Sequence, residues 1–113
     1  MMFNTIGYFQ FNNLIQGRIP MLLVLLDNID LAPWFNQVTR LHLENIVVHS
    51  QPEQVLPLIQ ERKLPLHYAV LVLDNDGVRS ASTVETLEKA GFTNAYYVKG
   101  GFTALANERT QQI

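Results

Sequence analysis

The stretch Tyr68-Ala69-Val70-Leu71-Val72-Leu73-Asp74-Asn75-Asp76-Gly77-Val78-Arg79-Ser80-Ala81 decides the fold of this chain. Residues 68–73 are a continuous apolar run, which is typical of a β-strand buried on both faces. A polar loop with one glycine follows, and Ser80 opens a segment with helical spacing. A strand, a tight loop and a helix N-terminus direct several N–H groups into one concavity, where the helix dipole favours negative charge. We therefore expect residues 74–79 to form an anion-binding loop, to which Arg79 adds a positive charge.

The rest of the chain alternates between predicted strands and predicted helices. Strands are expected at residues 4–6, 21–26, 45–49 and 95–98, and residues 40–43 are expected to be extended as well. Helices are expected at residues 8–16, from a Ser50–Glu53 capping box to Arg62 with a kink or break at Pro57, at 80–90 and at 102–108. Such alternation predicts an α/β fold, a parallel sheet of about five strands with helices on both faces. Ligands of such sheets sit beyond the carboxyl ends of the strands, which again points to residues 74–79.

Composition limits the classes of function. A chain of 113 residues with 48% hydrophobic and 16% charged residues predicts one globular domain, residues 1–113. The net charge of −2 and the lack of a basic cluster argue against nucleic-acid binding. With no cysteine, the chain has no disulfide and no thiolate chemistry. The start of the chain lacks the features of a secretory signal, and its longest aliphatic run is too short for a membrane span, so we expect a cytoplasmic protein.

The last third of the chain resembles a rhodanese-like (sulfurtransferase) domain. The resemblance is carried by residues 77–81 (GVRSA), 90–96 (AGFTNAY) and 100–105 (GGFTAL), and it continues more weakly upstream through Asp27 and through His42-Leu43. In that family a catalytic cysteine opens a loop that ends in arginine, serine and a helix. The resemblance puts the cysteine position at Asp74. It therefore implies the family's fold and argues against the family's chemistry, with the active-site-like loop formed by Asp74, Asn75, Asp76, Gly77, Val78, Arg79 and Ser80.

Asp74 has two interpretations. It could be an oxygen nucleophile or general base, although a hard carboxylate is a poor carrier of sulfane sulfur. The favoured interpretation is structural: Asp74 fills the anion site with its own charge, accepts loop N–H groups and pairs with Arg79. For Arg79, an ion pair with Asp74 or Asp76 is favoured over binding of an external anion. Ser80 is expected to cap a helix rather than act as a nucleophile.

A competing interpretation rests on residues 71–78. This segment also looks like the first motif of haloacid dehalogenase-type phosphatases, in which two aspartates at i and i+2 follow a buried strand and Mg²⁺ binds the first. That family needs a further acidic pair downstream, and no such pair follows Asp76.

The remaining candidates are assigned structural roles. His42, His49 and His67 are isolated, so no metal site is expected. Gly100-Gly101 is expected to be a turn with positive φ. Trp34 and Phe35 are expected in a loop, where they either pack against the core or, if exposed as a pair, are the first candidates for a protein contact. The sequence thus predicts a non-catalytic module without a cofactor that binds a partner protein or a small anion, or assists a catalytic relative by hetero-oligomerisation.

Overall fold

A computed structural model describes residues 4–112 as one α/β domain. Five strands form a single sheet: β1 (Thr5–Ile6), β2 (Leu22–Leu25), β3 (Val47–His49), β4 (Val70–Leu73) and β5 (Ala95–Val98). The other elements are α1 (Tyr8–Gln16), a 3₁₀ turn η1 (Ala32–Trp34), α2 (Gln37–Ile46), α3 (Pro52–Glu61), α4 (Val78–Lys89) and α5 (Gly101–Gln112). The prediction that the start of the chain is not a secretory signal concerns mostly residues 1–3, which lie outside the described range.

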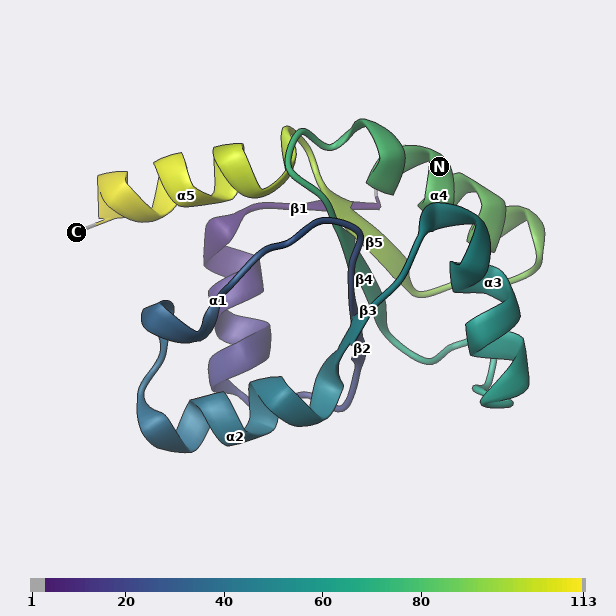
Figure 1. The fold of residues 1–113 in the computed structure, drawn as a ribbon, viewed down its shortest axis with the longest axis horizontal. Coiled ribbons are helices and arrows are strands. Elements are labelled where there is room, and N and C mark those ends of the chain that lie inside the picture. Colours follow the sequence, from purple (N-terminus) through teal and green to yellow (C-terminus); the bar gives the residue numbers. More distant parts are fainter. Residues whose placement is uncertain (1–3, 113) are drawn as a thin grey trace.

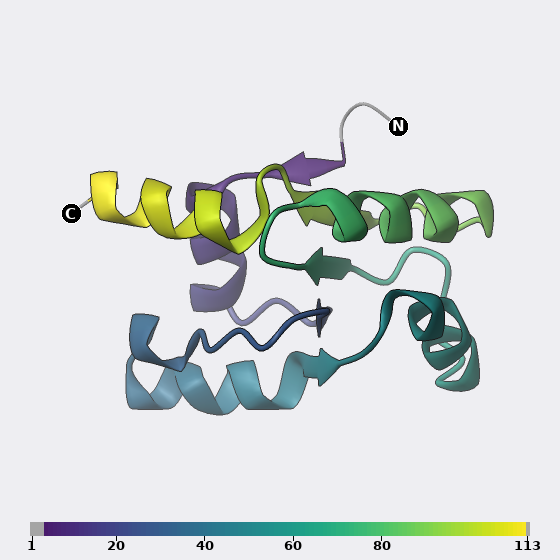
Figure 2. The ribbon, with the colours of Figure 1, turned by 45° about the horizontal axis from the view of Figure 1, so that its top comes forward.

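The sheet has the strand order β1-β5-β4-β2-β3, and each neighbouring pair is parallel. Figure 2 shows this order from β1 at the top to β3 at the bottom. The central strands β2 and β4 pair over their whole lengths, from Leu22 beside Val70 to Leu25 beside Leu73. The predicted fold class, a parallel sheet with helices on both faces, is confirmed.

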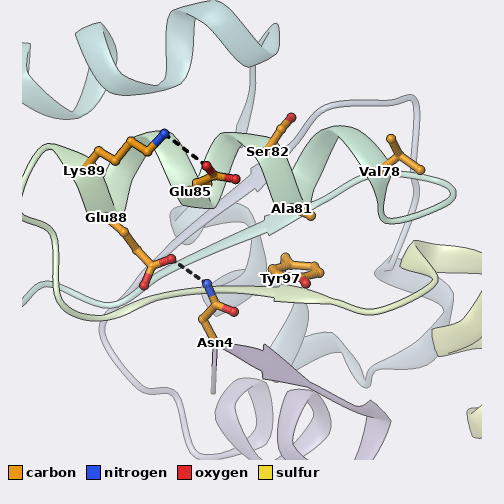
Figure 3. Close-up of a pocket in the computed structure, with 8 residues that line it drawn as sticks. All are labelled: Asn4, Val78, Ala81, Ser82, Glu85, Glu88, Lys89 and Tyr97. Carbon is orange, nitrogen blue, oxygen red and sulfur yellow. Dashed lines mark hydrogen bonds and ion pairs between the residues drawn. The ribbon is translucent and has the colours of Figure 1, made fainter. Parts of the chain in front are cut away.

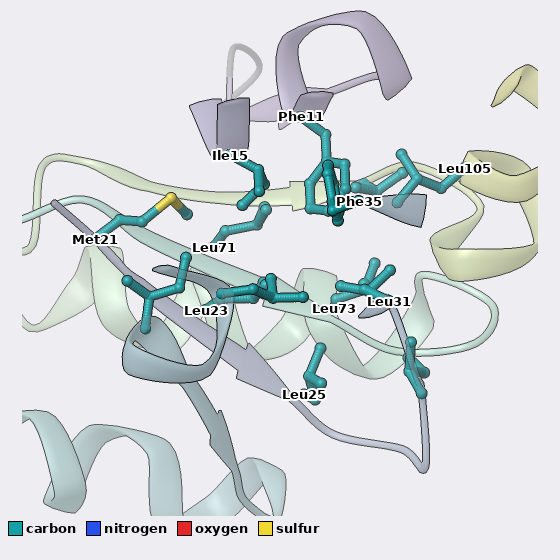
Figure 4. Close-up of a cluster of buried hydrophobic side chains, with 14 residues drawn as sticks. Phe11, Ile15, Met21, Leu23, Leu25, Leu31, Phe35, Leu71, Leu73 and Leu105 are labelled. Carbon is teal, nitrogen blue, oxygen red and sulfur yellow. The ribbon is translucent and has the colours of Figure 1, made fainter. Parts of the chain in front are cut away.

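The two faces of the central strands build two separate cores. Leu23, Leu25, Leu71 and Leu73 point to the face that Figure 1 shows covered by α1, α2 and α5. Figure 4 shows this core, in which they meet Phe11, Phe35 and Leu105. The alternate residues of both strands point to the face covered by α3 and α4. All four residues of β2 and all four residues of β4 are therefore buried, as the apolar runs predict, because a parallel sheet buries both of its faces.

The segment before β3 corrects the sequence prediction. Residues 40–43 are helical rather than extended, and the helix continues to Ile46, so that β3 begins at Val47 and not at Asn45. Asn36 caps α2 by accepting the N–H of Thr39 at 2.9 Å, and Thr39, Leu43 and Ile46 are buried at helical spacing. The local alternation of residues 40–43 concealed this longer period.

Helix α3 gives two further corrections. Pro57 lies inside a continuous helix that neither breaks nor divides there. The predicted capping box at Ser50 is absent: the N-cap is Gln51, and the Ser50 hydroxyl donates to the carbonyl of Gln51 at 2.9 Å. Pro52 at the first helical turn is the signal that starts this helix, because its fixed φ suits that position.

The terminal helices differ from the prediction mainly in their ends. Helix α4 begins at Val78 and ends at Lys89, just before the expected stop at Gly91. Its buried side chains are Ser80, Thr83, Val84 and Leu87, whereas Ala81 is half-buried and Ala90 is exposed, contrary to the predicted stripe. Helix α5 is longer than predicted, since it continues beyond Glu108 to Gln112.

Candidate functional site

The connections of the sheet place the loop between β4 and α4 at a topological switch point. The chain leaves β4 toward the face covered by α4, whereas it leaves both neighbours, β2 and β5, toward the face covered by α2 and α5. Neighbouring strands whose connections diverge leave a crevice at their carboxyl ends, which is where α/β sheets bind ligands. Residues 74–80, here called the 74–80 loop, lie at this switch point and include the first turn of α4, Val78–Ser80.

The Asp74 side chain fills the interior of the 74–80 loop. It is fully buried. Its Oδ1 accepts the N–H of Gly77 at 2.6 Å and the Ser80 hydroxyl at 2.9 Å, and its Oδ2 accepts the N–H of Ser80 at 2.9 Å. Buried carboxylates are tolerated where hydrogen bonds replace their hydration. The loop amides therefore converge on a carboxylate that belongs to the chain itself.

Arg79 corrects the sequence prediction. Its guanidinium pairs with Asp27, which follows β2, and not with Asp74 or Asp76. The other oxygen of Asp27 accepts the N–H of Asn75 at 2.8 Å. The hydrogen bond from Arg79, followed by that from Asn75, holds the pKa of Asp27 below its ordinary value of 3.8. The hydrogen bond to Asp27 in turn raises the pKa of Arg79. Asp27 thus ties the 74–80 loop to the end of β2.

The remaining acid of the loop also binds a loop amide. Asp76 Oδ1 accepts the N–H of Val78 at 3.0 Å, and the Val78 side chain itself is 67% exposed. Together with the bonds above, the amides of Asn75, Gly77, Val78 and Ser80 all donate to side-chain carboxylates of the chain. An external anion would have to displace these carboxylates to reach the same donors.

Ser80 is a part of the site rather than the predicted helix cap. The N-cap of α4 is Gly77, in the left-handed region with φ 85°, and Ser80 lies three residues into the helix. Both its amide and its hydroxyl donate to Asp74, and the side chain is fully buried. It is therefore one of the groups that hold the buried carboxylate.

The start of α5 forms the other wall of the loop. The N–H of Phe102 donates to the carbonyl of Asp74 at 2.7 Å, and the N–H of Thr103 donates to that of Asn75 at 3.2 Å. A Cβ on Gly101 would lie 2.6 Å from backbone atoms of Asp74, Asp76 and Gly77, so only glycine fits there. The sequence predicted the Gly100-Gly101 turn, with φ of 82° and 66°, but not its contact with the 74–80 loop.

The other candidate residues lie outside the site. Trp34 is half-buried, stacks on Phe102 with ring centroids 5.3 Å apart and carries the guanidinium of Arg109 at 5.1 Å. Phe35 is buried in the core, so Trp34 and Phe35 are packing residues, one of the two alternatives that the sequence left open, and not an exposed pair. Within residues 4–112, no three histidine, aspartate or glutamate side chains gather into a group that could hold a metal ion.

A hollow in the surface lies away from the 74–80 loop, between α4 and the β1–β5 edge of the sheet (Figure 3). Its volume is about 740 Å³, and Figure 3 shows Asn4 bonded to Glu88 at 2.8 Å and Lys89 paired with Glu85 at 3.1 Å around it. Apart from Val78, the side chains of the 74–80 loop do not line it.

None of the helices in residues 4–112 is long and apolar enough to cross a membrane.

Solved structures resemble this fold at low sequence identity. The rhodanese-like domain of an Anabaena protein matches with a TM-score of 0.67 and 13% identity, over 93% of this chain and 74% of that one. A protein of Staphylococcus saprophyticus matches with a TM-score of 0.62 and 17% identity, over 93% and 95%. Thiosulfate sulfurtransferase of Pseudomonas aeruginosa matches with a TM-score of 0.66 and 12% identity, but over 92% of this chain and only 18% of its own length.

Sequence comparison reaches the same family. No curated protein matches the chain significantly. The profile of the rhodanese-like domain, however, matches residues 13–108, which include every strand except β1 and the whole 74–80 loop. A profile match over most of the chain and the same fold in solved rhodanese-like structures agree, and this chain belongs to the rhodanese-like domain family.

Proposed function

We propose that this rhodanese-like domain is a non-catalytic module that binds another protein. The chain has no cysteine, so it cannot form the persulfide on which sulfur transfer in this family depends. The position that the family resemblance assigns to the cysteine holds Asp74.

The observation that carries the proposal is the burial of the Asp74 carboxylate. Its side chain has no solvent exposure, and both of its oxygens are engaged by Gly77 and Ser80. A nucleophile or general base must reach the reacting atom at hydrogen-bond distance or closer. A carboxylate enclosed by its own loop supports a structural role better than either catalytic one.

The same geometry favours a protein partner over a small anion at the loop. Four loop amides already donate to carboxylates, and Arg79 is paired with Asp27. An incoming anion would also meet the negative charges of Asp27, Asp74 and Asp76. Binding is therefore better assigned to the outer surface of the domain than to the interior of the 74–80 loop.

The first test is sulfur transfer from thiosulfate to cyanide, with a cysteine-containing rhodanese as the positive control. The wild-type chain is expected to show no transfer above the uncatalysed background. A robust rate would overturn the proposal. A Mg²⁺-dependent hydrolysis of a generic phosphate ester that disappears in an Asp74→Asn variant shown by circular dichroism to be folded would instead promote the phosphatase alternative.

The second test places a thiol back in the loop. In Asp74→Cys the thiolate would receive the N–H groups of Gly77 and Ser80, so its pKa should fall below the ordinary value of about 8.5. Asp76→Cys is the matched control, because its thiol lies two residues away on the exposed side of the same loop. Equal thiol pKa values in the two variants, measured by the pH dependence of the ultraviolet absorbance of the thiolate, would mean that the loop amides do not converge on position 74.

A further inference from the structure

The sheet has two edge strands, β1 and β3. In the order β1-β5-β4-β2-β3, β3 has β2 on one side and, among residues 4–112, no strand on the other. Edge strands offer unpaired backbone groups to extended peptides. Strand β3 is short, residues Val47–His49, and His49 is exposed.

The register identifies the backbone groups that face outward. Ser50 donates its N–H to the carbonyl of Leu25 at 3.2 Å, and His49 lies directly beside Leu25 in the parallel ladder. Alternate residues of a parallel strand bond to the same neighbour. The N–H and the carbonyl of His49 therefore point away from β2, toward the position that an added strand would take.

Two hollows flank this edge, and Leu25 and His49 line both. One, of about 420 Å³, lies on the α2 side, with Leu31, Leu43 and Val47 among its apolar lining. The other, of about 570 Å³, lies at the start of α3, with Asn28, Ser50 and Gln51 in its lining. Successive side chains of an extended segment point to opposite faces of a sheet, so one segment on β3 could place neighbouring side chains in the two hollows.

The charges around the hollows select the chemistry of the segment. Asp30 and Glu44 line the α2-side hollow. Asp27 lines the hollow at the start of α3 and is already paired with Arg79. Among the described residues that line the two hollows there is no lysine or arginine. The nearby Arg40 uses its Nε to donate to the carbonyls of Ala32, at the start of η1, and of Phe35, just after η1. The α2-side hollow is thus apolar at its base and acidic at its rim, which suits the long stem and charged end of a lysine or arginine.

We infer that β3 is the docking strand for an extended, basic segment of a partner protein, with a lysine or arginine in the hollow bounded by Asp30 and Glu44. This inference rests on the proposed binding role and gives it a surface and a partner chemistry. Backbone pairing along β3 supplies the orientation, and the acidic rim distinguishes basic from acidic segments.

The probe is a capped eight-residue peptide of alternating lysine and valine, compared with its glutamate–valine counterpart. Titration of the full chain, followed by backbone amide NMR, is expected to shift Val47, Val48, His49 and Ser50 with the basic peptide only. Glu44→Lys should weaken this binding roughly three- to tenfold, from the loss of one surface attraction and the gain of one repulsion. Glu85→Lys, an exposed glutamate on α4 with the same change of charge, should weaken it less than about twofold.

A second variant tests the edge pairing itself. His49→Pro removes an N–H that the sheet does not use, so the fold should persist while peptide binding is lost. Binding that is unchanged in both Glu44→Lys and His49→Pro, equal binding of the acidic peptide, or no binding of either peptide would overturn the inference. These outcomes leave the non-catalytic assignment standing, because that assignment depends on the sulfur-transfer assay and not on the peptide.

Discussion

Replacing Asp74 by asparagine should destabilise the domain strongly, because the carboxylate is a structural group of the 74–80 loop. The side chain is fully buried and accepts three hydrogen bonds, from the Gly77 amide, the Ser80 amide and the Ser80 hydroxyl. Asparagine keeps one acceptor oxygen and presents an NH₂ group where the second oxygen stood. At least one loop donor then faces another donor.

The magnitude follows from these contacts. One buried donor without an acceptor costs about 1–3 kcal/mol, and each remaining bond loses roughly 1 kcal/mol when its acceptor is no longer charged. Relief from burying a charge offsets a part of this loss. The net expectation is a free energy of unfolding lower by about 2–4 kcal/mol, and a Tm lower by roughly 8–16 °C for a domain of this size.

The assay is urea denaturation followed by the fluorescence of Trp34, the one tryptophan of the chain, with far-UV circular dichroism as the second probe. Asp76→Asn is the control, because Asp76 is exposed and makes one bond, to Val78, that asparagine can also accept. It should cost less than about 1 kcal/mol. If Asp74→Asn were as stable as the wild type or more stable, the carboxylate would not be structural, and a functional role bought at the expense of stability would be favoured instead.

Three further measurements test the surroundings of the loop. Because the pKa of Asp27 is lowered in the folded state, its pair with Arg79 contributes stability that is complete well above pH 3.8 and is lost as the pH falls through the folded-state pKa. The Tm difference between wild type and Asp27→Asn should therefore shrink as the pH is lowered through this range. A Tm difference that stays constant would contradict this. Gly101→Ala should cost more than about 3 kcal/mol and clearly more than Gly91→Ala, which has a similar positive φ but only a side-chain neighbour at 3.7 Å; equal losses in urea denaturation would contradict the close backbone approach. Pro57→Ala should raise the free energy of unfolding by about 1–2 kcal/mol, because Pro57 lies exposed inside α3 where an alanine can restore a helical hydrogen bond; unchanged thermal stability would contradict this.

The sequence was sufficient for the fold and for the strand–loop–helix arrangement around residues 74–80 because both depend on local pattern. The apolar runs that became β2 and β4 are buried on both faces, and Gly77 and Gly101 mark the turns that shape the loop. Helix α2 was missed because four alternating residues, Arg40 to Leu43, match a strand when they are read alone. Its helical period appears only over the span from Thr39 to Ile46.

The wrong partner for Arg79 has a different cause. Asp74 and Asp76 are near in sequence, whereas Asp27 is 52 residues away and reaches Arg79 only because β2 and β4 are neighbours in the sheet. Strand order was not derivable from the alternation of strands and helices. The same holds for α5: nothing local in Phe102 or Thr103 indicates that their amides bond to carbonyls of the 74–80 loop.

These long-range contacts explain how the loop can keep its shape without a cysteine at position 74. A ring of converging N–H groups needs an acceptor at its centre, and a buried carboxylate supplies one. Through Asp74 the loop bonds to the first turn of α4, through Asp27 to the end of β2, and through its carbonyls to the start of α5. Asp74 therefore cannot be released to react without breaking the connection between the loop and α4. The chemistry of the loop and its cohesion compete, which is why we place the proposed binding role of this domain at its open edge, β3, and not inside the loop.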